Sequence, residues 1–337
     1  MTRNKSSTTP EDPGRRCFIK RFSRVAALSA VVGGGAWLWR DPTGPRSFTP
    51  QEGRESIATL GDFQIPGTQG KLAIARGTDR QKTLAAALTA LGGMKRFVQS
   101  GDRVLLKVNA AFAASAELGA TTHPELAAAL VTACRAAGAA EVSVTDNPIH
   151  DPAGAFLLTG IQGAVEKAGG RVILPAEPLF TPLSLPGGRL IRQWPVLGGP
   201  FAGITKVIGV APVKDHHRSG ASLTLKNWYG LLGGRRNVFH QDIHTIISEL
   251  GQLLRPTLVV LDGTVSMMTN GPTGGSLADL KSTATLIAGT DSVAVDACGA
   301  ELLGRSAADL PYLRKAEAAG VGRVDFRALQ PLEVQTG

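Results

Sequence analysis

Short apolar runs alternate with helix-length segments through most of this 337-residue chain, and this alternation restricts its fold more than any other feature. The segment Arg103–Val108 is apolar at consecutive positions, a pattern typical of a strand that is buried on both faces. Pro124 and Gly138 enclose a helical pattern, because Pro favours a first turn and Gly a helix end. The sequence therefore predicts an α/β fold with a mainly parallel sheet and helices on both faces.

The same patterns predict the positions of the individual elements. The expected strands are 71–76, 103–108, 141–145, 171–174, 206–213, 257–261 and 284–288. The expected helices are 81–98, 124–137, 155–168, 243–254, 292–303 and 308–319. We expect one domain over 71–330. Its segment 176–203 is rich in Pro and Gly and is predicted to be an insertion or a crossover, which leaves an arrangement in two lobes open.

The first 40 residues have the layout of an export signal. Arg15 and Arg16 precede the apolar stretch 25–39, and the paired arginines resemble a twin-arginine signal. The expected partner is the twin-arginine export machinery, and the expected location is the periplasm or another extracytoplasmic compartment. The stretch is shorter than the about 20 residues of a membrane span, yet no clear cleavage site follows it, so an N-terminal membrane anchor stays open. Residues 41–70 are expected to form a linker.

Composition argues against two classes of protein. The net charge is +9, but residues 1–45 carry five of these charges and aromatic residues make up only 5%, so no nucleic-acid groove is expected. Outside the signal the cysteines are Cys134 and Cys298, too few for an iron–sulfur cluster or a cysteine-rich zinc site. We expect both to be small core residues, with a disulfide as the alternative.

Polar residues follow the predicted strands at the edge where parallel sheets bind ligands. These residues are Lys107, Asn109, Asp146, Asn147, Lys214, Asp215, His216, His217, Asp262 and Asp291. An Asp or Asn after a strand also caps the next helix, so capping stays open for each of them. Taken together they predict a ligand site.

Five ordered motifs resemble a known family. They are Lys107-Val-Asn109 with Ala120–Glu125, Val213–His216, Thr224–Gly230, Leu261–Gly263 with Asn270–Gly275, and Gly289–Ala297. Over about residues 71–304 the chain resembles the domain-of-unknown-function family 362, and this resemblance implies no settled reaction. Some members of that family carry iron–sulfur clusters on additional cysteines. This chain lacks those cysteines, so the resemblance implies no cluster here.

Two histidines suggest a metal. His240 and His244 have i, i+4 spacing, which places both imidazoles on one face of a helix and suits a divalent ion. His217 and Asp262 complete the predicted ligand set. The alternative is a pair of solvated helix residues, and the cofactor, if any, stays unidentified.

Three lysines are the other candidates. Lys107, Lys214 and Lys226, together with His216, are the predicted catalytic residues, with the lysines clamping a carboxylate or phosphate. The predicted ligand-binding residues are Asn109, Thr122, Asp146, Asn227, Asn270 and Gly271. Alternatively, the lysines pair with aspartates in a structural network, because burying an unpaired charge is costly.

No complete phosphate-binding loop, dinucleotide fingerprint or hydrolase nucleophile elbow is present. We therefore expect an exported protein that binds an anionic ligand, a divalent metal or both at the strand ends, and whether it is an enzyme stays open. The alternative is a non-catalytic periplasmic binding or assembly partner of an iron–sulfur or redox protein. The anion and metal hypotheses both require the lysines and histidines to share one pocket.

Overall fold

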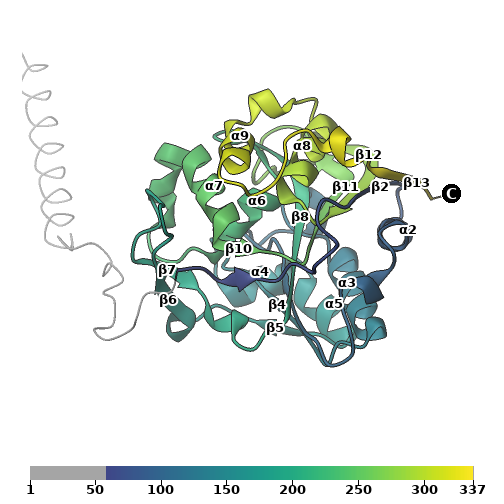
Figure 1. Ribbon diagram of the computed structural model, residues 1–337, viewed down its shortest axis with the longest axis horizontal. Helices are drawn as coiled ribbons and strands as arrows, with labels where there is room; N and C mark the ends of the chain where they lie inside the picture. Colours follow the sequence, from purple (N-terminus) through teal and green to yellow (C-terminus); the bar gives the residue numbers. More distant parts are fainter. Residues whose placement is uncertain (1–57, 337) are drawn as a thin grey trace, which may run out of the picture. The chain divides into compact units, whose positions relative to one another are not determined.

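A mixed β-sheet runs through the part of the chain that the structure describes. The computed structural model describes residues 58–336, in which nine strands form one sheet of order β13-β2-β12-β11-β8-β3-β4-β5, with β9 paired to β8 (Figure 1). The strands are β2 (Leu72–Arg76), β3 (Arg103–Lys107), β4 (Glu141–Thr145), β5 (Arg171–Ile173), β8 (Lys206–His216), β9 (Gly220–Ser222), β11 (Leu258–Met267), β12 (Leu280–Gly289) and β13 (Leu332–Gln335). Parallel pairing joins β11, β8, β3, β4 and β5 in one block. The α/β fold with a mainly parallel sheet is confirmed.

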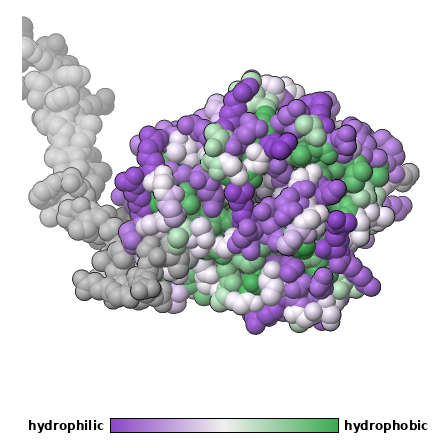
Figure 2. Space-filling model, viewed as in Figure 1, coloured by the Kyte–Doolittle hydropathy of each residue, from purple (hydrophilic) through white to green (hydrophobic). Residues whose placement is uncertain are grey.

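Helices cover both faces of this sheet, as the sequence predicts. They are α2 (Arg80–Ala90), α3 (Pro124–Ala137), α4 (Pro152–Leu158), α5 (Ile161–Lys167), α6 (Thr224–Asn227), α7 (Ile243–Leu253), α8 (Ser292–Leu302) and α9 (Pro311–Ala318). Side chains alternate across β3: Val104 and Leu106 pack with α2, α3 and α5, whereas Leu105 packs with α6 to α9. Two apolar cores therefore fix the sheet from opposite sides. Figure 1 shows the helices that cover the sheet, and Figure 2 shows hydrophilic residues over much of the visible surface.

Local sequence explains where α3 begins and ends. Pro124 occupies its first turn, and the side chain of His123 accepts a hydrogen bond from the Glu125 amide. Gly138 ends the helix with φ of 109°, a left-handed conformation that glycine adopts at little cost. This helix has the predicted bounds, and its end returns the chain to β4.

Two predicted helices are shorter in the structure because glycines interrupt them. The helix expected over 81–98 ends at Ala90, since Gly92 and Gly93 have φ of 99° and 86°. The helix expected over 155–168 is divided into α4 and α5 at Gly160, whose φ is 74°. In both places a left-handed backbone is incompatible with continuing the helix.

The direction of β12 differs from the parallel arrangement predicted for its neighbours. It pairs antiparallel with β11 on one side and with β2 on the other, so its carboxyl end lies at the opposite edge from those of β3, β4 and β8. Asp291, predicted to face the ligand site, is therefore remote from it. Its carboxylate caps α8 by accepting a hydrogen bond from the Ala294 amide.

The remaining segments pack around the main sheet. β1 (Gly61–Asp62) pairs with β10 (Leu254–Arg255), and the predicted crossover contains the antiparallel pair β6 (Phe180–Leu183) and β7 (Trp194–Leu197). The predicted export signal, and residues 41–57 of the predicted linker, lie outside the described residues. Within 58–336, no helix has the length and apolar character required to cross a bilayer.

Candidate functional site

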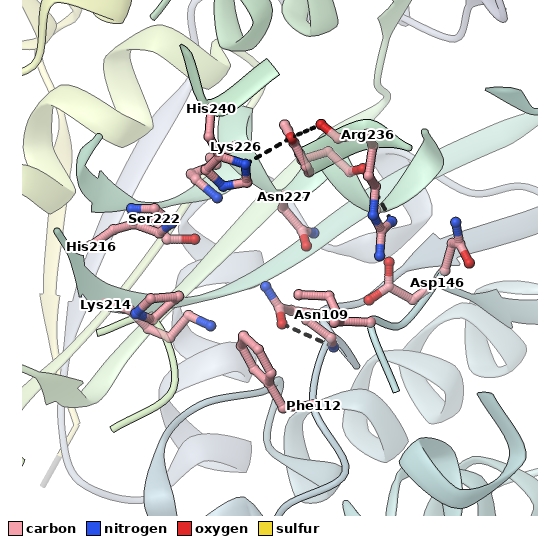
Figure 3. Close-up of a pocket in the computed structure, with 16 residues that line it drawn as sticks. Asn109, Phe112, Asp146, Lys214, His216, Ser222, Lys226, Asn227, Arg236 and His240 are labelled. Atoms are coloured by element: carbon pink, nitrogen blue, oxygen red, sulfur yellow. Dashed lines mark hydrogen bonds between the residues drawn. The ribbon is translucent and has the colours of Figure 1, made fainter. Parts of the chain in front are cut away.

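A cavity opens where β3, β4 and β8 reach the carboxyl edge of the sheet (Figure 3). Its empty volume, open mouth included, is about 530 Å³. Its polar lining consists of Asn109, Asp146, Asn147, Lys214, His216, Ser222, Lys226, Asn227, Arg236 and His240. Its less polar wall consists of Ala111, Phe112, Ile149, Tyr229, Gly230 and Pro272. The topology thus brings lysines and histidines from separate segments into one pocket.

A buried ion pair lies at the base of the cavity. Lys107 Nζ is 2.8 Å from Asp146 Oδ1, and both side chains are almost fully buried. The lysine also donates hydrogen bonds to the carbonyl oxygens of Val108 and Asn227, each at 2.7 Å. Burial lowers the pKa of Lys107, and Asp146 opposes that shift. Lys107 thus has the aspartate partner of the structural alternative, and it lies below the cavity and is not among the residues that line it.

Gly230 allows the chain to cross this ion pair closely. It lies in the short helix η5 (Trp228–Leu231), and a Cβ atom at this position would be 1.9 Å from Asp146 Oδ1 and 2.9 Å from Lys107 Nζ. Its carbonyl accepts a hydrogen bond of 3.0 Å from the Asn147 amide. The last residue of the Thr224–Gly230 motif must therefore be glycine, because any side chain there would collide with the buried ion pair.

Lys214 extends from β8 into the cavity without a carboxylate partner. Its ammonium donates a 2.5 Å hydrogen bond to the Ala120 carbonyl and lies 5.3 Å from the centre of the Phe112 ring. Burial, followed by the charge of Lys226, lowers its pKa from 10.5 to about 7. A lysine in this state gains or loses its proton near neutral pH.

Lys226, from α6, has still fewer contacts. Among the described residues its ammonium has no hydrogen-bond or ion-pair partner, and it lies 5.1 Å from the centre of the Tyr229 ring. The residue is 8% exposed, and burial, followed by the charge of Arg236, lowers its pKa to about 7. Figure 3 shows this side chain among the groups that surround the cavity.

Arg236 adds a third cation that the sequence analysis did not select. It begins η6 (Arg236–Asp242), and its guanidinium donates to the carbonyl oxygens of Leu232 at 3.2 Å and Pro148 at 3.0 Å. Burial lowers its pKa, while Asp146 acts in the opposite direction. In the sequence this residue stands out only as part of the Arg235-Arg236 pair, which follows a glycine-rich turn. The fold, and not the sequence, shows that this pair lies near the strand ends.

Two imidazoles of the cavity are held by their neighbours. His216 Nδ1 accepts hydrogen bonds from the backbone amides of Arg218 and Ser219, which assigns the proton of the neutral ring to Nε2. Burial, followed by the charge of Lys226, lowers the pKa of His216 to about 2. His240 Nδ1 lies 3.2 Å from the Tyr229 hydroxyl, and burial lowers the pKa of this histidine too. Both rings are neutral at pH 7.

The four predicted metal ligands do not form one group. His217 and His240 both stack against His216, with ring centres 5.0 and 6.0 Å from that of His216, and His217 also contacts the Gly271 carbonyl. His244 instead stacks on Tyr312, with ring centres 6.2 Å apart. Asp262 lies in β11 and accepts a 2.9 Å hydrogen bond from Arg80 Nε. Within residues 58–336 there is no group of three or more His, Cys, Asp or Glu side chains that can hold a metal ion. The residues present do not fit the predicted site.

The failure of the histidine pair has a local cause. The i, i+4 argument requires one continuous helix through both residues, but α7 begins at Ile243, after His240. His240 lies in η6, a 3-10 helix, and its ring contacts Tyr229, whereas the His244 ring contacts Tyr312. The two imidazoles therefore face different parts of the protein.

The predicted amide and hydroxyl ligands divide into two groups. Asn109 and Asn227 line the cavity, although Asn227 Nδ2 already donates to the Lys107 and Val210 carbonyls. Thr122 is fully buried and links the Asn109 amide to the Val210 carbonyl. Outside the lining, the Asn270 side-chain amide donates to Asp279, and the Gly271 amide donates to Asp215. The run from Asn270 to Gly275 is thus a turn, and Pro272 is its contribution to the lining.

The cysteines have the predicted core role. Cys134 and Cys298 are both buried and free, so the alternative of a disulfide between them is wrong. Burial raises the pKa of each thiol to about 12. Neither cysteine lines the cavity.

Comparison with known proteins agrees with the resemblance. A family model described as "Domain of unknown function (DUF362)" matches residues 104–301, a range that contains every residue lining the cavity. The chain is also 26% identical over 268 residues to a thylakoid-associated protein, sll1697, of Synechocystis sp.. That alignment covers 74% of this chain and 78% of the relative.

Proposed function

This chain belongs to the DUF362 family, and from that premise we propose that its cavity binds a small organic anion through Lys214, Lys226 and Arg236. One observation carries the proposal: these three cations converge on the cavity, and none forms an ion pair with a carboxylate in the described part of the chain. The nearby carboxylate of Asp146 is already paired with Lys107. The site therefore has an excess of positive charge that a ligand can neutralise.

The electrostatic cost of burying these cations together supports the same proposal. Burying like charges together without a counter-ion is unfavourable, and a carboxylate, sulfate or phosphate removes that cost while forming charge-assisted hydrogen bonds. The two lysines have pKa values of about 7, so an anion favours their protonated forms on binding. We therefore expect anion binding to be accompanied by proton uptake at neutral pH.

The apolar part of the lining restricts the class of anion. The ring centres of Phe112 and Tyr229 lie 5.3 and 5.1 Å from the ammonium groups of Lys214 and Lys226. Ala111, Ile149 and Pro272 add further apolar surface, and Asn109 and Ser222 add uncharged polar groups. A small molecule that carries an acid group on a short carbon skeleton matches this mixed lining better than an inorganic ion does.

Titration calorimetry with sulfate, inorganic phosphate and pyruvate tests the proposal. We expect Lys214→Met, Lys226→Met and Arg236→Met each to weaken binding of at least one of these anions by tenfold or more. Lys167→Met is the matched control, because it removes one positive charge from an exposed position at the end of α5. Absence of binding for all three anions, or an equal loss in the control, would contradict the proposal.

We also propose that the full-length chain is exported through the twin-arginine pathway. Arg15 and Arg16 before an apolar stretch support this, as does the name of the Synechocystis relative, which describes that protein as thylakoid-associated. Fractionation of a bacterium that expresses the full chain tests the proposal. Replacing both arginines by lysine is expected to retain the protein in the cytoplasm, whereas unchanged export would refute the assignment.

A further inference from the structure

We propose that Lys226 is a nucleophile that forms an imine with the carbonyl carbon of a small anionic aldehyde or ketone, such as a 2-oxo acid. This inference rests on the proposed function, because the acid group of the substrate is held by the cavity cations. It adds a covalent step that simple anion binding does not require.

The position of Lys226 separates it from the other lysines of the site. Its ammonium has no hydrogen-bond or ion-pair partner in residues 58–336 and lies over the face of Tyr229. In contrast, Lys107 is paired with Asp146, and Lys214 donates to the Ala120 carbonyl. Lys226 is therefore the amine that can move toward a bound carbonyl without first breaking a hydrogen bond or an ion pair.

The surroundings also supply the free amine that imine formation needs. A nearly buried position and the charge of Arg236 lower the pKa of Lys226 to about 7, so before an anion binds half of the molecules carry a neutral amine at that pH. An ordinary lysine with a pKa near 10.4 has roughly one neutral amine in 2,500 at pH 7. A lysine desolvated beside another cation is a recognised form of activated nucleophile.

Arg236 and Lys214 suit the binding of the acid group. The guanidinium of Arg236 is held by backbone carbonyls at 3.0 and 3.2 Å, which fixes its position without neutralising its charge. Lys214 lies on β8, and its charge acts on the same region as that of Lys226. An acid group between these cations places the adjacent carbonyl carbon inside the cavity, where Lys226 is the unpartnered amine.

The reaction balances without an oxidant, a reductant or a metal. The lone pair of the Lys226 amine attacks the carbonyl carbon, the C=O π electrons move to oxygen, and a proton passes from nitrogen to oxygen to give a carbinolamine. A second proton reaches the hydroxyl, water leaves, and the nitrogen lone pair completes the C=N bond. With a pKa of about 7, Lys214 can donate the proton to the departing hydroxyl. The immediate products are the protonated imine, one water molecule and neutral Lys214. Return of the nitrogen proton to Lys214 then gives the neutral imine.

Reductive trapping tests this step. The full-length protein is incubated with pyruvate and sodium cyanoborohydride, and adducts are located by intact-mass analysis and peptide mapping. We expect one adduct, on Lys226, with a rate that is greatest near pH 7 and falls on both sides, because the step needs neutral Lys226 and protonated Lys214. Methyl pyruvate has the same ketone without the negative charge and is expected to react at least tenfold more slowly. Lys226→Arg is expected to abolish the adduct while keeping a positive charge in the cavity.

Calorimetry with pyruvate and no reductant separates this inference from the proposed function. Pyruvate binding that requires Arg236, without an adduct on Lys226, would overturn the imine and leave anion binding intact. An adduct located on Lys214 or on exposed lysines would overturn it as well. If no anion binds and no adduct forms, both proposals fail together.

Discussion

Replacing Lys226 by Met is expected to stabilise the protein at neutral pH while it weakens anion binding. Folding lowers the pKa of Lys226 from 10.5 to about 7. Since each pKa unit corresponds to about 1.4 kcal/mol, burial of this charge destabilises the fold by about 5 kcal/mol when both states hold the proton. Met also loses the cation–π contact with Tyr229, worth up to about 2 kcal/mol. We expect the free energy of unfolding to rise by about 3 kcal/mol.

The sign of the pH dependence follows from the direction of the pKa shift. Below pH 7 Lys226 is charged in both the folded and the unfolded protein. The full free-energy cost of burying its charge is then present, and the gain in stability from Lys226→Met is largest. Between pH 7 and pH 10.5 the unfolded chain holds a proton that the folded chain lacks, so the stability of the unmodified protein rises with pH. The advantage of the variant therefore decreases over this interval and is lost near its upper end.

Urea unfolding at pH 6, 8 and 10 measures this difference. The contrasting variant is Lys107→Met, which leaves the Asp146 carboxylate buried without its partner and is expected to cost about 3–5 kcal/mol. Two lysines of one site thus have opposite predicted effects. A Lys226→Met protein that is less stable than the unmodified protein at pH 6, or an advantage that does not change with pH, would refute the reasoning.

Three further predictions concern the cavity and the core. Gly230→Ala is expected to lower the free energy of unfolding by about 1–3 kcal/mol, because the added Cβ would lie 1.9 Å from Asp146 Oδ1. The control in the same urea assay is Gly163→Ala, whose added Cβ has no atom within 4 Å, and it should not lower the free energy of unfolding. Sulfate affinity measured by calorimetry should fall as pH rises from 6 to 9, because the two cavity lysines without carboxylate partners have pKa values of about 7; constant affinity would count against their role. Cys134 and Cys298 should resist iodoacetamide at pH 8 in the native protein and react in urea, because burial raises both thiol pKa values to about 12; mass spectrometry detects the adducts, and rapid native labelling would contradict this burial.

The fold could be predicted from the sequence because the patterns that indicate it most strongly involve residues close together in the chain. A continuous apolar run such as Arg103–Val108 needs a cover on both faces, and glycine or proline at the ends of α3 marks where the chain turns. The position of the cavity could be predicted for the same reason. Lys107 is in register with Thr145 on β4 and Gly209 on β8, so the residues that follow β3 and β4 meet the second half of β8 at one edge.

The direction of a strand, in contrast, could not be predicted from the pattern of apolar residues. An apolar run looks the same whether it pairs parallel or antiparallel, so the pattern over 284–288 did not reveal that β12 runs against β11. That single reversal moves Asp291 to the far edge of the sheet, where it caps α8. The i, i+4 spacing of the two histidines was equally ambiguous, because α7 begins at Ile243, after His240, and so does not contain both residues.

The three lysines show why a ligand site requires the fold as well as the motif. In the sequence each has the same description, a lysine beside an apolar segment, and either a structural or a ligand-binding role is consistent with it. Asp146 follows β4 by one residue, and parallel pairing of β3 with β4 brings it to Lys107. Lys214, in contrast, is opposite Ser222 on β9, and that strand, Gly220–Ser222, contains no acidic residue. Strand adjacency therefore decides which lysine is neutralised within the protein and which is left to recognise an anion.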